Sequence, residues 1–566
     1  MELKINNTIN FQRRLKPKEE GEYSAVLKEA KEKIGNKGKS ILIVPTSSLP
    51  QEKQNNTGIG TLNQKESEKF FDFAKKYWGI NEIQIQPVGQ YHCWQGQYPI
   101  YSGTSMDLGN HMIDIKSHCT QEEFAELVKA NNDCKTINYT NIVDKYSKQE
   151  EILRKIYSRE KSNPEFINFK TENSKMLEPK ALYRALTEIN HTHNYKQWND
   201  IDKNLYSLPQ IEREKRIAEI YKIKDKEIDF YKFKQFLAEN DLKKAKNELN
   251  KKGLKLNGDM ICGFSFDEIW SHPNAFFKDK TMKWDLLALD LNSKEAEQFI
   301  REKVNNYAKR FDGLRIDASW TYIQPLDKDY EDKILNIIDD EIKKVKGADF
   351  DLHNIMHEFA ASAEEFSLYK NNELRPCVKD RVKIYTSDWL SNDWGTNESF
   401  LNRGWKPDSF IIGATNHDSK PIKVSEQQAE VLSKILKIPK EKLMNETEFI
   451  KAKFAEPMMA YNNMIYYRDA LAISGDKISA DFENAYFKNL ETGKGFNPMD
   501  ALEKSFRAKG LDKTEPELFK KIVKYRKILE NKKTSHWKIA GLAIGAGILI
   551  SAGFVLFQNK NKNKNR

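Results

Sequence analysis

Short apolar runs recur along this chain, and charged segments whose apolar residues have helical spacing separate them. Each run has the length of a single strand. The predicted strands are residues 39–45, 82–88, 255–264, 309–317, 354–358, 382–387, 409–418 and 464–467. Strands that alternate with helices are typical of parallel β/α units. Eight of them predict an α/β fold, a (β/α)8 TIM barrel whose chemistry lies at the C-terminal ends of its strands.

A long charged stretch interrupts this alternation between residues 121 and 250 and is predicted to be a helical insertion in the barrel. The pattern divides the rest of the chain into successive regions. These are an N-terminal extension (1–38), the barrel with its insertion (39–475), a helical linker (476–536), a transmembrane helix (537–558) and a basic tail (559–566).

The predicted transmembrane helix contains an uncharged run, IAGLAIGAGILISAGFVLF at residues 539–557. A run of this length can span a bilayer, and a helix that is apolar on every face is unusual in a soluble core. Lysine and arginine are denser before the run than after it, which favours a cytoplasmic N-terminal part. The first 20 residues lack the apolar segment of a secretory signal. We therefore expect a cytoplasmic protein that a single-pass helix anchors to a membrane.

Composition excludes several classes of protein. The net charge is +10, but 93 Lys+Arg nearly balance 83 Asp+Glu and no arginine-rich stripe is present, so we expect no nucleic-acid partner. Five cysteines without a CxxC pair fit a reduced compartment better than a disulfide framework. Cys119 follows His118, but no third ligand has metal spacing, so no metal site is predicted. We also expect no cofactor.

The stretch FDGLRIDASW, residues 311–320, holds the first candidate chemistry. Arg315 and Asp317 alternate about Ile316, so on a strand they share one face. A neighbouring cation keeps a carboxylate ionised at neutral pH, and an ionised carboxylate can attack carbon. A structural ion pair at the end of the strand is the simpler interpretation of these residues taken alone.

Two further predicted strands also end in acids, Glu358 after His357 and Asp418 after His417. In a barrel the ends of these strands converge on one mouth. Retaining glycoside hydrolysis needs a nucleophilic carboxylate and a second carboxyl group about 5 Å away. Three acids at equivalent strand ends therefore indicate glycosidic-bond chemistry. An aromatic and amide-rich loop at residues 90–101 suits stacking on sugar rings, although ordinary loop packing explains it equally well.

Residues 41–475 resemble glycoside hydrolase family 77, the amylomaltases or 4-α-glucanotransferases of the α-amylase clan. The motifs that carry this resemblance keep the family's order and spacing. They are PTSSLP with Gly58-Ile59-Gly60, EIQIQPVG, YSGTSMDLGNHMIDI, ALYRALTEINHTHNYKQWND, NGDMICGFSFDEIWSHPNAFF, FDGLRIDASW, MHEFA, NHDS and YYRDALAISG.

The resemblance implies a role for each matching residue. Asp317 is the expected nucleophile, Glu358 the expected general acid and base, and Asp418 the expected transition-state stabiliser. The substrate-binding residues that the resemblance implies are Arg315, His417, Tyr101 and Asp259. The implied reaction transfers an α-1,4-glucan segment from a maltooligosaccharide donor to the 4-hydroxyl of an acceptor.

The chain also departs from the family pattern. The sequence that follows Phe277 leaves no room for the family's aromatic acceptor-side loop, and the family's His-Asp-Asn-Asp is His417-Asp418-Ser419-Lys420 here. These departures affect the choice of acceptor and leave three alternatives open. They are an α-glucan hydrolase, an inactive membrane-tethered glucan-binding protein, and a tail-anchored scaffold without glucan function.

Overall fold

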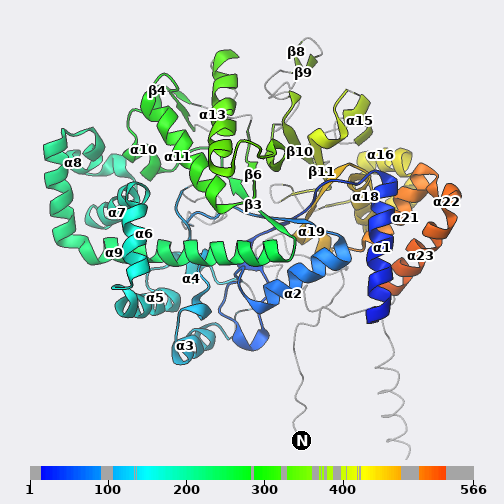
Figure 1. The fold of residues 1–566 in the computed structure, drawn as a ribbon, viewed down its shortest axis with the longest axis horizontal. Coiled ribbons are helices and arrows are strands. Elements are labelled where there is room, and N and C mark those ends of the chain that lie inside the picture. The colour runs from blue at the N-terminus through cyan, green and yellow to red at the C-terminus, as the bar shows by residue number, and fades with distance from the viewer. Residues whose placement is uncertain are drawn as a thin grey trace, which may run out of the picture.

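The computed structural model describes residues 15–90, 106–132, 134, 137–281, 286–319, 328–359, 369–370, 373–374, 379–386, 397–402, 404–416, 419, 422–472 and 496–530. Eight parallel strands close into a barrel in the order β1-β12-β11-β10-β7-β6-β3-β2 (Figure 1). They are β1 (Ser40–Val44), β2 (Glu82–Ile85), β3 (Lys255–Met260), β6 (Gly313–Ile316), β7 (Ile355–His357), β10 (Val382–Thr386), β11 (Phe410–Gly413) and β12 (Asn462–Tyr466). All eight predicted strands are present, and the predicted (β/α)8 barrel is confirmed.

Alternation along the strands separates two apolar clusters. In β1, Ile41 and Ile43 pack with alternate residues of β7, β10, β11 and β12, whereas Leu42 and Val44 belong to the cluster shared with the surrounding helices. Successive side chains of a strand point to opposite faces, so the first cluster fills the barrel and the second joins it to its helices. The strands are buried on both faces, which explains their nearly continuous apolar sequence.

Helices surround the barrel and cover the outer faces of its strands (Figure 1). They include α1 (Pro17–Ile34), α2 (Lys65–Phe73) with the π-helical turn Ala74–Trp78, α11 (Lys294–Arg310), α13 (Lys328–Lys346), α15 (Asn397–Asn402), α16 (Glu426–Leu436), α17 (Lys440–Leu443), α18 (Glu446–Met458) and α19 (Tyr467–Ala472). Two small hairpins lie outside the barrel, β4 (Phe276–Thr281) with β5 (Leu287–Leu289) and β8 (Tyr369–Lys370) with β9 (Glu373–Leu374).

The residues predicted to form a helical insertion are helical. They form α3 (Gln121–Asn131), α4 (Thr140–Val143), α5 (Lys148–Glu160), α6 (Pro164–Glu172), α7 (Ser174–Ile189), α8 (Asp200–Lys203) and the long α9 (Gln210–Lys251). A buried ion pair ties them to α10 (Phe266–Ser271) of the barrel, with 2.6 Å between Lys180 Nζ and Asp267 Oδ2. Trp270 Nε1 also donates to the Asp202 carbonyl at 2.9 Å. The insertion is therefore joined directly to the segment that follows β3.

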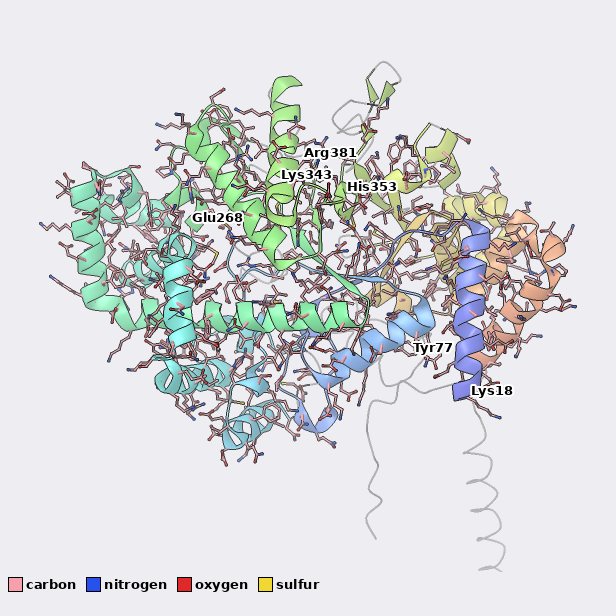
Figure 2. The ribbon with its side chains drawn as sticks, in the orientation of Figure 1. Lys18, Tyr77, Glu268, Lys343, His353 and Arg381 are labelled. Carbon is pink, nitrogen blue, oxygen red and sulfur yellow. The ribbon has the colours of Figure 1, made fainter. Side chains whose placement is uncertain are left out.

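Helix α1 packs beside α21 (Pro498–Lys509) and α23 (Pro516–Glu530), with α22 (Leu511–Thr514) between these two in sequence (Figure 1). Tyr77, labelled in Figure 2, joins the π-helical turn to α1. Its carbonyl accepts a hydrogen bond from the Tyr23 hydroxyl at 2.5 Å, and its own hydroxyl donates to Glu20 Oε1 at 2.8 Å. These contacts hold the segment before β1 against the segment before β2.

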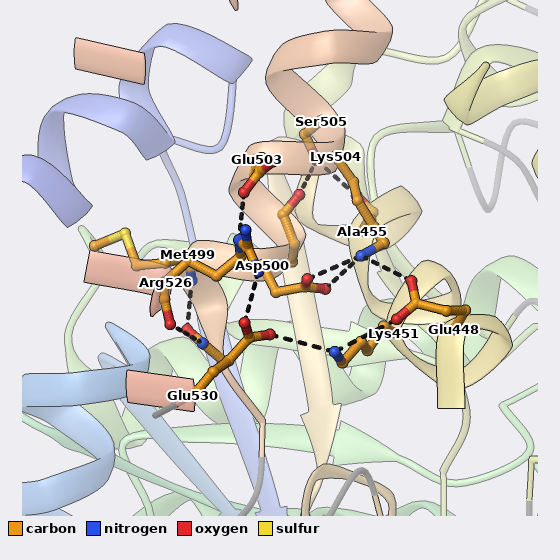
Figure 3. Close-up of polar contacts among 12 residues, drawn as sticks. Glu448, Lys451, Ala455, Met499, Asp500, Glu503, Lys504, Ser505, Arg526 and Glu530 are labelled. Atoms are coloured by element: carbon orange, nitrogen blue, oxygen red, sulfur yellow. Dashed lines mark hydrogen bonds and ion pairs between the residues drawn. The ribbon is translucent and has the colours of Figure 1, made fainter. Parts of the chain in front are cut away.

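Charged contacts hold α21 and α23 against α18 (Figure 3). Lys451 Nζ lies 3.3 Å from Glu530 Oε1, and Lys504 Nζ lies 3.5 Å from Glu448 Oε2. Residues 498–530, which lie in the region predicted as a helical linker, are thus packed against the outer helices of the barrel.

No helix in the described part of the chain combines the length and the hydrophobicity that a bilayer crossing requires. The predicted transmembrane helix, residues 537–558, lies outside that part, as does the basic tail.

Candidate active site

One buried guanidinium collects three carboxylates at the C-terminal end of the barrel. Arg315 Nη1 donates to both oxygens of Asp259, at 2.8 and 2.7 Å. Arg315 Nη2 lies 2.8 Å from Asp317 Oδ1 and 2.7 Å from Glu358 Oε2. The planar guanidinium has its donors in a fixed fork, so it holds the three acids in a defined relative arrangement.

Strand register explains why these residues meet. Strand β6 lies between β3 and β7, and Asp259 of β3 is paired with Arg315 of β6. On the other side Ile316 is paired with His357, so Asp317 and Glu358 each follow a paired residue at the end of a neighbouring strand. Parallel strands bring their C-terminal ends to one edge, which places all four side chains at the same mouth.

The two candidate catalytic carboxylates are close together. Asp317 Oδ1 and Glu358 Oε2 contact the same nitrogen, at 2.8 and 2.7 Å. They can be no farther apart than the sum of these distances, which lies within the roughly 5–5.5 Å between the carboxyl groups of retaining glycosidases. The geometry therefore suits a nucleophile with an adjacent acid and base, and leaves less room than an inverting mechanism needs for its water.

The three carboxylates differ in their exposure. Asp259 is fully buried, and the side chain of Glu358 is 5% exposed, whereas that of Asp317 is 18% exposed. Asp317 is thus the most accessible acid on Arg315, as a group that attacks a substrate must be. Both oxygens of Asp259 accept from Arg315 Nη1, so this buried carboxylate helps to orient the guanidinium.

Cys262, in the segment that follows β3, also contacts Asp317. Its backbone N–H donates to Asp317 Oδ2 at 3.4 Å. Burial raises the pKa of the Cys262 thiol well above its ordinary value, and the charge of Asp317 raises it further. The thiol therefore stays protonated and adds no negative charge to the mouth.

The segment after Asp317 is tied to β7. The Ala318 N–H donates to Glu358 Oε2 at 2.9 Å, and Ser319 Oγ lies 3.1 Å from His357 Nδ1. Burial lowers the pKa of His357 well below its ordinary value, and the charges of Arg381 (labelled in Figure 2) and Lys383 lower it further. His357 is therefore a neutral group that holds the two strand ends together.

Three carboxylates contact one cationic side chain at this mouth. One guanidinium faces the carboxylates of Asp259, Asp317 and Glu358. Carboxylates held close together in a largely buried site favour the positive charge that develops on a sugar ring during glycosidic cleavage. The described part of the chain contains no group of His, Cys, Asp and Glu side chains that could hold a metal ion.

Four of the seven predicted site residues, Arg315, Asp317, Glu358 and Asp259, thus lie together. The other three, Tyr101, His417 and Asp418, lie outside the described residues. The roles given to all seven stay predictions. The sequence did not indicate the backbone donors at Cys262 and Ala318. Every residue except proline has an N–H group, and the tertiary structure determines which of these groups contact the carboxylates.

Comparisons with known proteins find similarity to one family. The family model for glycoside hydrolase family 77, described as 4-alpha-glucanotransferase, matches residues 44–283. A 4-alpha-glucanotransferase of Clostridium butyricum is 25% identical over 347 residues, which cover 55% of this chain and 66% of that relative. The match thus spans slightly less than two thirds of the relative's length.

Solved structures share the fold. An amylomaltase from Streptococcus agalactiae in complex with acarbose superposes with a TM-score of 0.59 and 16% identity, covering 81% of this chain and all of that one. An amylomaltase from Corynebacterium glutamicum superposes with a TM-score of 0.54 and 13% identity, covering 85% of this chain and 76% of that one.

Proposed function

We propose that this chain is a member of glycoside hydrolase family 77 and a 4-α-glucanotransferase that moves α-1,4-glucan segments between maltooligosaccharides, as its similarity to that family's model and to a 4-alpha-glucanotransferase supports. The observation that carries the proposal is the shared contact of Asp317 and Glu358 with one nitrogen of Arg315. A retaining double displacement requires two carboxyl groups at about this separation.

In the proposed reaction Asp317 attacks the anomeric carbon of the donor while Glu358 protonates the departing glycosidic oxygen. A covalent glucosyl-enzyme results, and the shortened glucan leaves. Glu358, now ionised, takes the proton from the 4-hydroxyl of an acceptor glucan, whose oxygen then displaces Asp317. Arg315 orients both carboxylates throughout, and Asp259 holds Arg315 in place. The reaction needs no cofactor and no metal.

The remaining predicted residues complete the proposal. Asp418 would stabilise the transition state, His417 would hold sugar hydroxyls, and Tyr101 would contact a sugar ring. Asp259 was also predicted to bind substrate, and that role stays a prediction beside its contact with Arg315.

Maltotriose as the sole substrate tests this function. The purified chain should convert it to glucose and to maltooligosaccharides longer than maltotriose, which chromatography of the products would resolve. Glucose and maltose alone would identify water as the acceptor, and the chain would then be an α-glucan hydrolase. Binding of maltotriose without any product would identify an inactive glucan-binding protein instead.

We also propose that residues 537–558 hold the catalytic part on the cytoplasmic side of a membrane. The support is the uncharged run at 539–557 and the greater density of lysine and arginine before it. Cells that express the chain with and without residues 536–566 can be fractionated. The full chain should sediment with membranes and the shortened chain should not, whereas identical distributions would contradict the anchor.

A further inference from the structure

Two donors meet on one oxygen of Glu358. Arg315 Nη2 donates to Oε2 at 2.7 Å, and the Ala318 N–H donates to the same atom at 2.9 Å. Neither a guanidinium nor an amide N–H can accept a hydrogen bond in return. An ionised or carbonyl-type oxygen accepts from such donors far better than an oxygen that carries a proton. Oε2 is thus held in an acceptor role, with its position set from two directions.

The backbone of Ala318 is unusual. Three described residues other than glycine have a φ in the left-handed region, namely His191, Ala318 and Lys437. His191 and Lys437 are exposed and lie at or just beyond the ends of helices α7 and α16, where this conformation is common. Ala318, with a φ of 40°, is buried and directly follows the candidate nucleophile at the end of β6.

A strained conformation at a buried residue persists only where the surrounding structure favours it, and such residues cluster at functional sites. At Ala318 the left-handed φ lies in the turn that follows Asp317, and the N–H of the same residue donates to Glu358 Oε2 at the end of β7. The same short segment therefore contains Asp317 and donates a hydrogen bond to Glu358, the other proposed catalytic carboxylate.

We propose that Ala318 is a positioning residue for the acid and base, and that with Arg315 it assigns the transferable proton of Glu358 to Oε1. The inference rests on the proposed function and concerns the same site. In the first half-reaction the Oε1–H bond breaks, and the proton goes to the glycosidic oxygen as that oxygen takes the electron pair of the C1–O bond. In the second half-reaction the acceptor hydroxyl returns a proton to Oε1 as its oxygen bonds to C1, and the C1–O bond to Asp317 breaks with its electron pair returning to the carboxylate.

Two reactions with different glycosyl donors and acceptors distinguish this positioning role from a general effect on the fold. Maltotriose reacting with itself needs Glu358 in both half-reactions. Maltosyl fluoride reacting with azide needs it in neither, because fluoride leaves without a proton and azide attacks without losing one. Both pairs need Asp317 as the nucleophile, so a disturbed nucleophile slows both reactions.

The variants are Ala318→Val, Ala318→Ser and Ala318→Gly in the full chain. Valine is β-branched and disfavours a left-handed φ, so it should move the N–H off Oε2, whereas glycine adopts this φ without strain. Ala318→Val should lower kcat on maltotriose by about 100-fold or more, while the reaction of maltosyl fluoride with azide changes by less than about 5-fold. Ala318→Gly should stay within about 3-fold of wild type in both reactions, and Ala318→Ser should lie between the two.

The pH profile is a second readout. A hydrogen bond donated to a carboxylate favours its ionised form, so loss of the Ala318 donor should move the alkaline limb of the maltotriose profile to higher pH. A residue that only shaped the turn would not shift this limb.

Equal losses in the two reactions for Ala318→Val or Ala318→Ser would overturn the inference, as would an Ala318→Val enzyme with wild-type kcat on maltotriose. Ala318→Ser is the milder substitution, so it decides the question if Ala318→Val does not fold. Failure of the proposed function is separate, because the wild-type enzyme would then form no maltooligosaccharide longer than maltotriose.

Discussion

The two ends of the barrel each contain a buried polar network, and their charges are balanced differently. At the N-terminal ends of the strands Glu82 accepts from Lys39 Nζ at 2.8 Å and from Asn257 Nδ2 at 2.8 Å. Asn354 Oδ1 accepts from Lys39 Nζ at 2.7 Å and from Lys255 Nζ at 3.0 Å. One carboxylate is thus shared among several donors. At the C-terminal ends the ratio of carboxylates to donor side chains is reversed, since three carboxylates share Arg315.

The difference separates a network that stabilises from one suited to catalysis. In the first network both oxygens of Glu82 accept hydrogen bonds, so removing the acid would leave the mostly buried ammonium of Lys39 without a carboxylate. In the second, the crowded acids and the strained backbone at Ala318 cost stability, and in the proposed reaction the acids would supply negative charge where a sugar cation forms. In such a barrel, residues at the N-terminal ends of the strands are expected to contribute to stability, and residues at the C-terminal ends are expected to carry the chemistry.

Asp317→Asn should have the largest effect of any substitution at the catalytic end. An amide cannot form the glucosyl ester, so kcat on maltotriose should fall by about four orders of magnitude or more. Removing one of three crowded charges should leave the free energy of unfolding unchanged or raise it by about 1 kcal/mol. Product assays and urea unfolding would measure the two effects. Retention of near-normal turnover would show that Asp317 is not the nucleophile.

Glu358→Gln should have the second largest effect on turnover. Loss of the general acid and base should lower kcat on maltotriose by about 10²–10⁴-fold. Maltosyl fluoride with azide should recover most of the rate, and the product should be an α-maltosyl azide, because the nucleophile still acts from the opposite face. A β-azide, or a loss that the activated donor does not recover, would contradict the two-carboxylate mechanism.

Glu82→Ala should lower stability and leave turnover nearly unchanged, whereas the variants at the C-terminal end of the barrel should mainly lower turnover. It leaves Lys39 buried without its carboxylate, so the free energy of unfolding should fall by about 3 kcal/mol while kcat stays within about 2-fold of wild type. Glu82→Gln is the matched control, because the amide retains a hydrogen-bond acceptor and should lose less. A large loss of kcat in a folded Glu82→Ala enzyme would contradict the proposal that the Glu82 network contributes to stability and not to catalysis.

The pH dependence of stability should show the contribution of His357 at the catalytic end. Burial, with the charges of Arg381 and Lys383, lowers its pKa well below 6.5. Below about pH 6.5 the unfolded chain therefore binds a proton that the folded protein does not, and stability falls as the pH falls. Between pH 7 and pH 5 this contribution is up to about 2 kcal/mol. His357→Gln should lose correspondingly less stability over that range in urea titrations, and an identical loss would contradict the neutral state of His357.

Much of the fold could be predicted from local patterns. Each of the eight strands was visible as a short apolar run, because burial on both faces demands apolar residues at successive positions. Asp317 and Glu358 stood out because acids at the ends of apolar runs are exceptions to that demand. The matching motifs then connected these positions to a family.

Other features depended on contacts between residues far apart in the chain. No local pattern indicates that Arg315 also contacts Asp259 and Glu358, because that depends on the register of β6 between β3 and β7. Nor did the sequence indicate that α21 and α23 pack against α1 and α18.

The sequence by itself determined the strands, the helical insertion and the acids that end the strands, since these follow from the alternation of apolar and polar side chains along a local segment. The tertiary structure alone decided which carboxylates share a guanidinium, which of them is accessible, and which backbone N–H reaches Glu358 Oε2. The physical reason is that barrel closure and strand register set distances between segments that the chain itself leaves unconstrained.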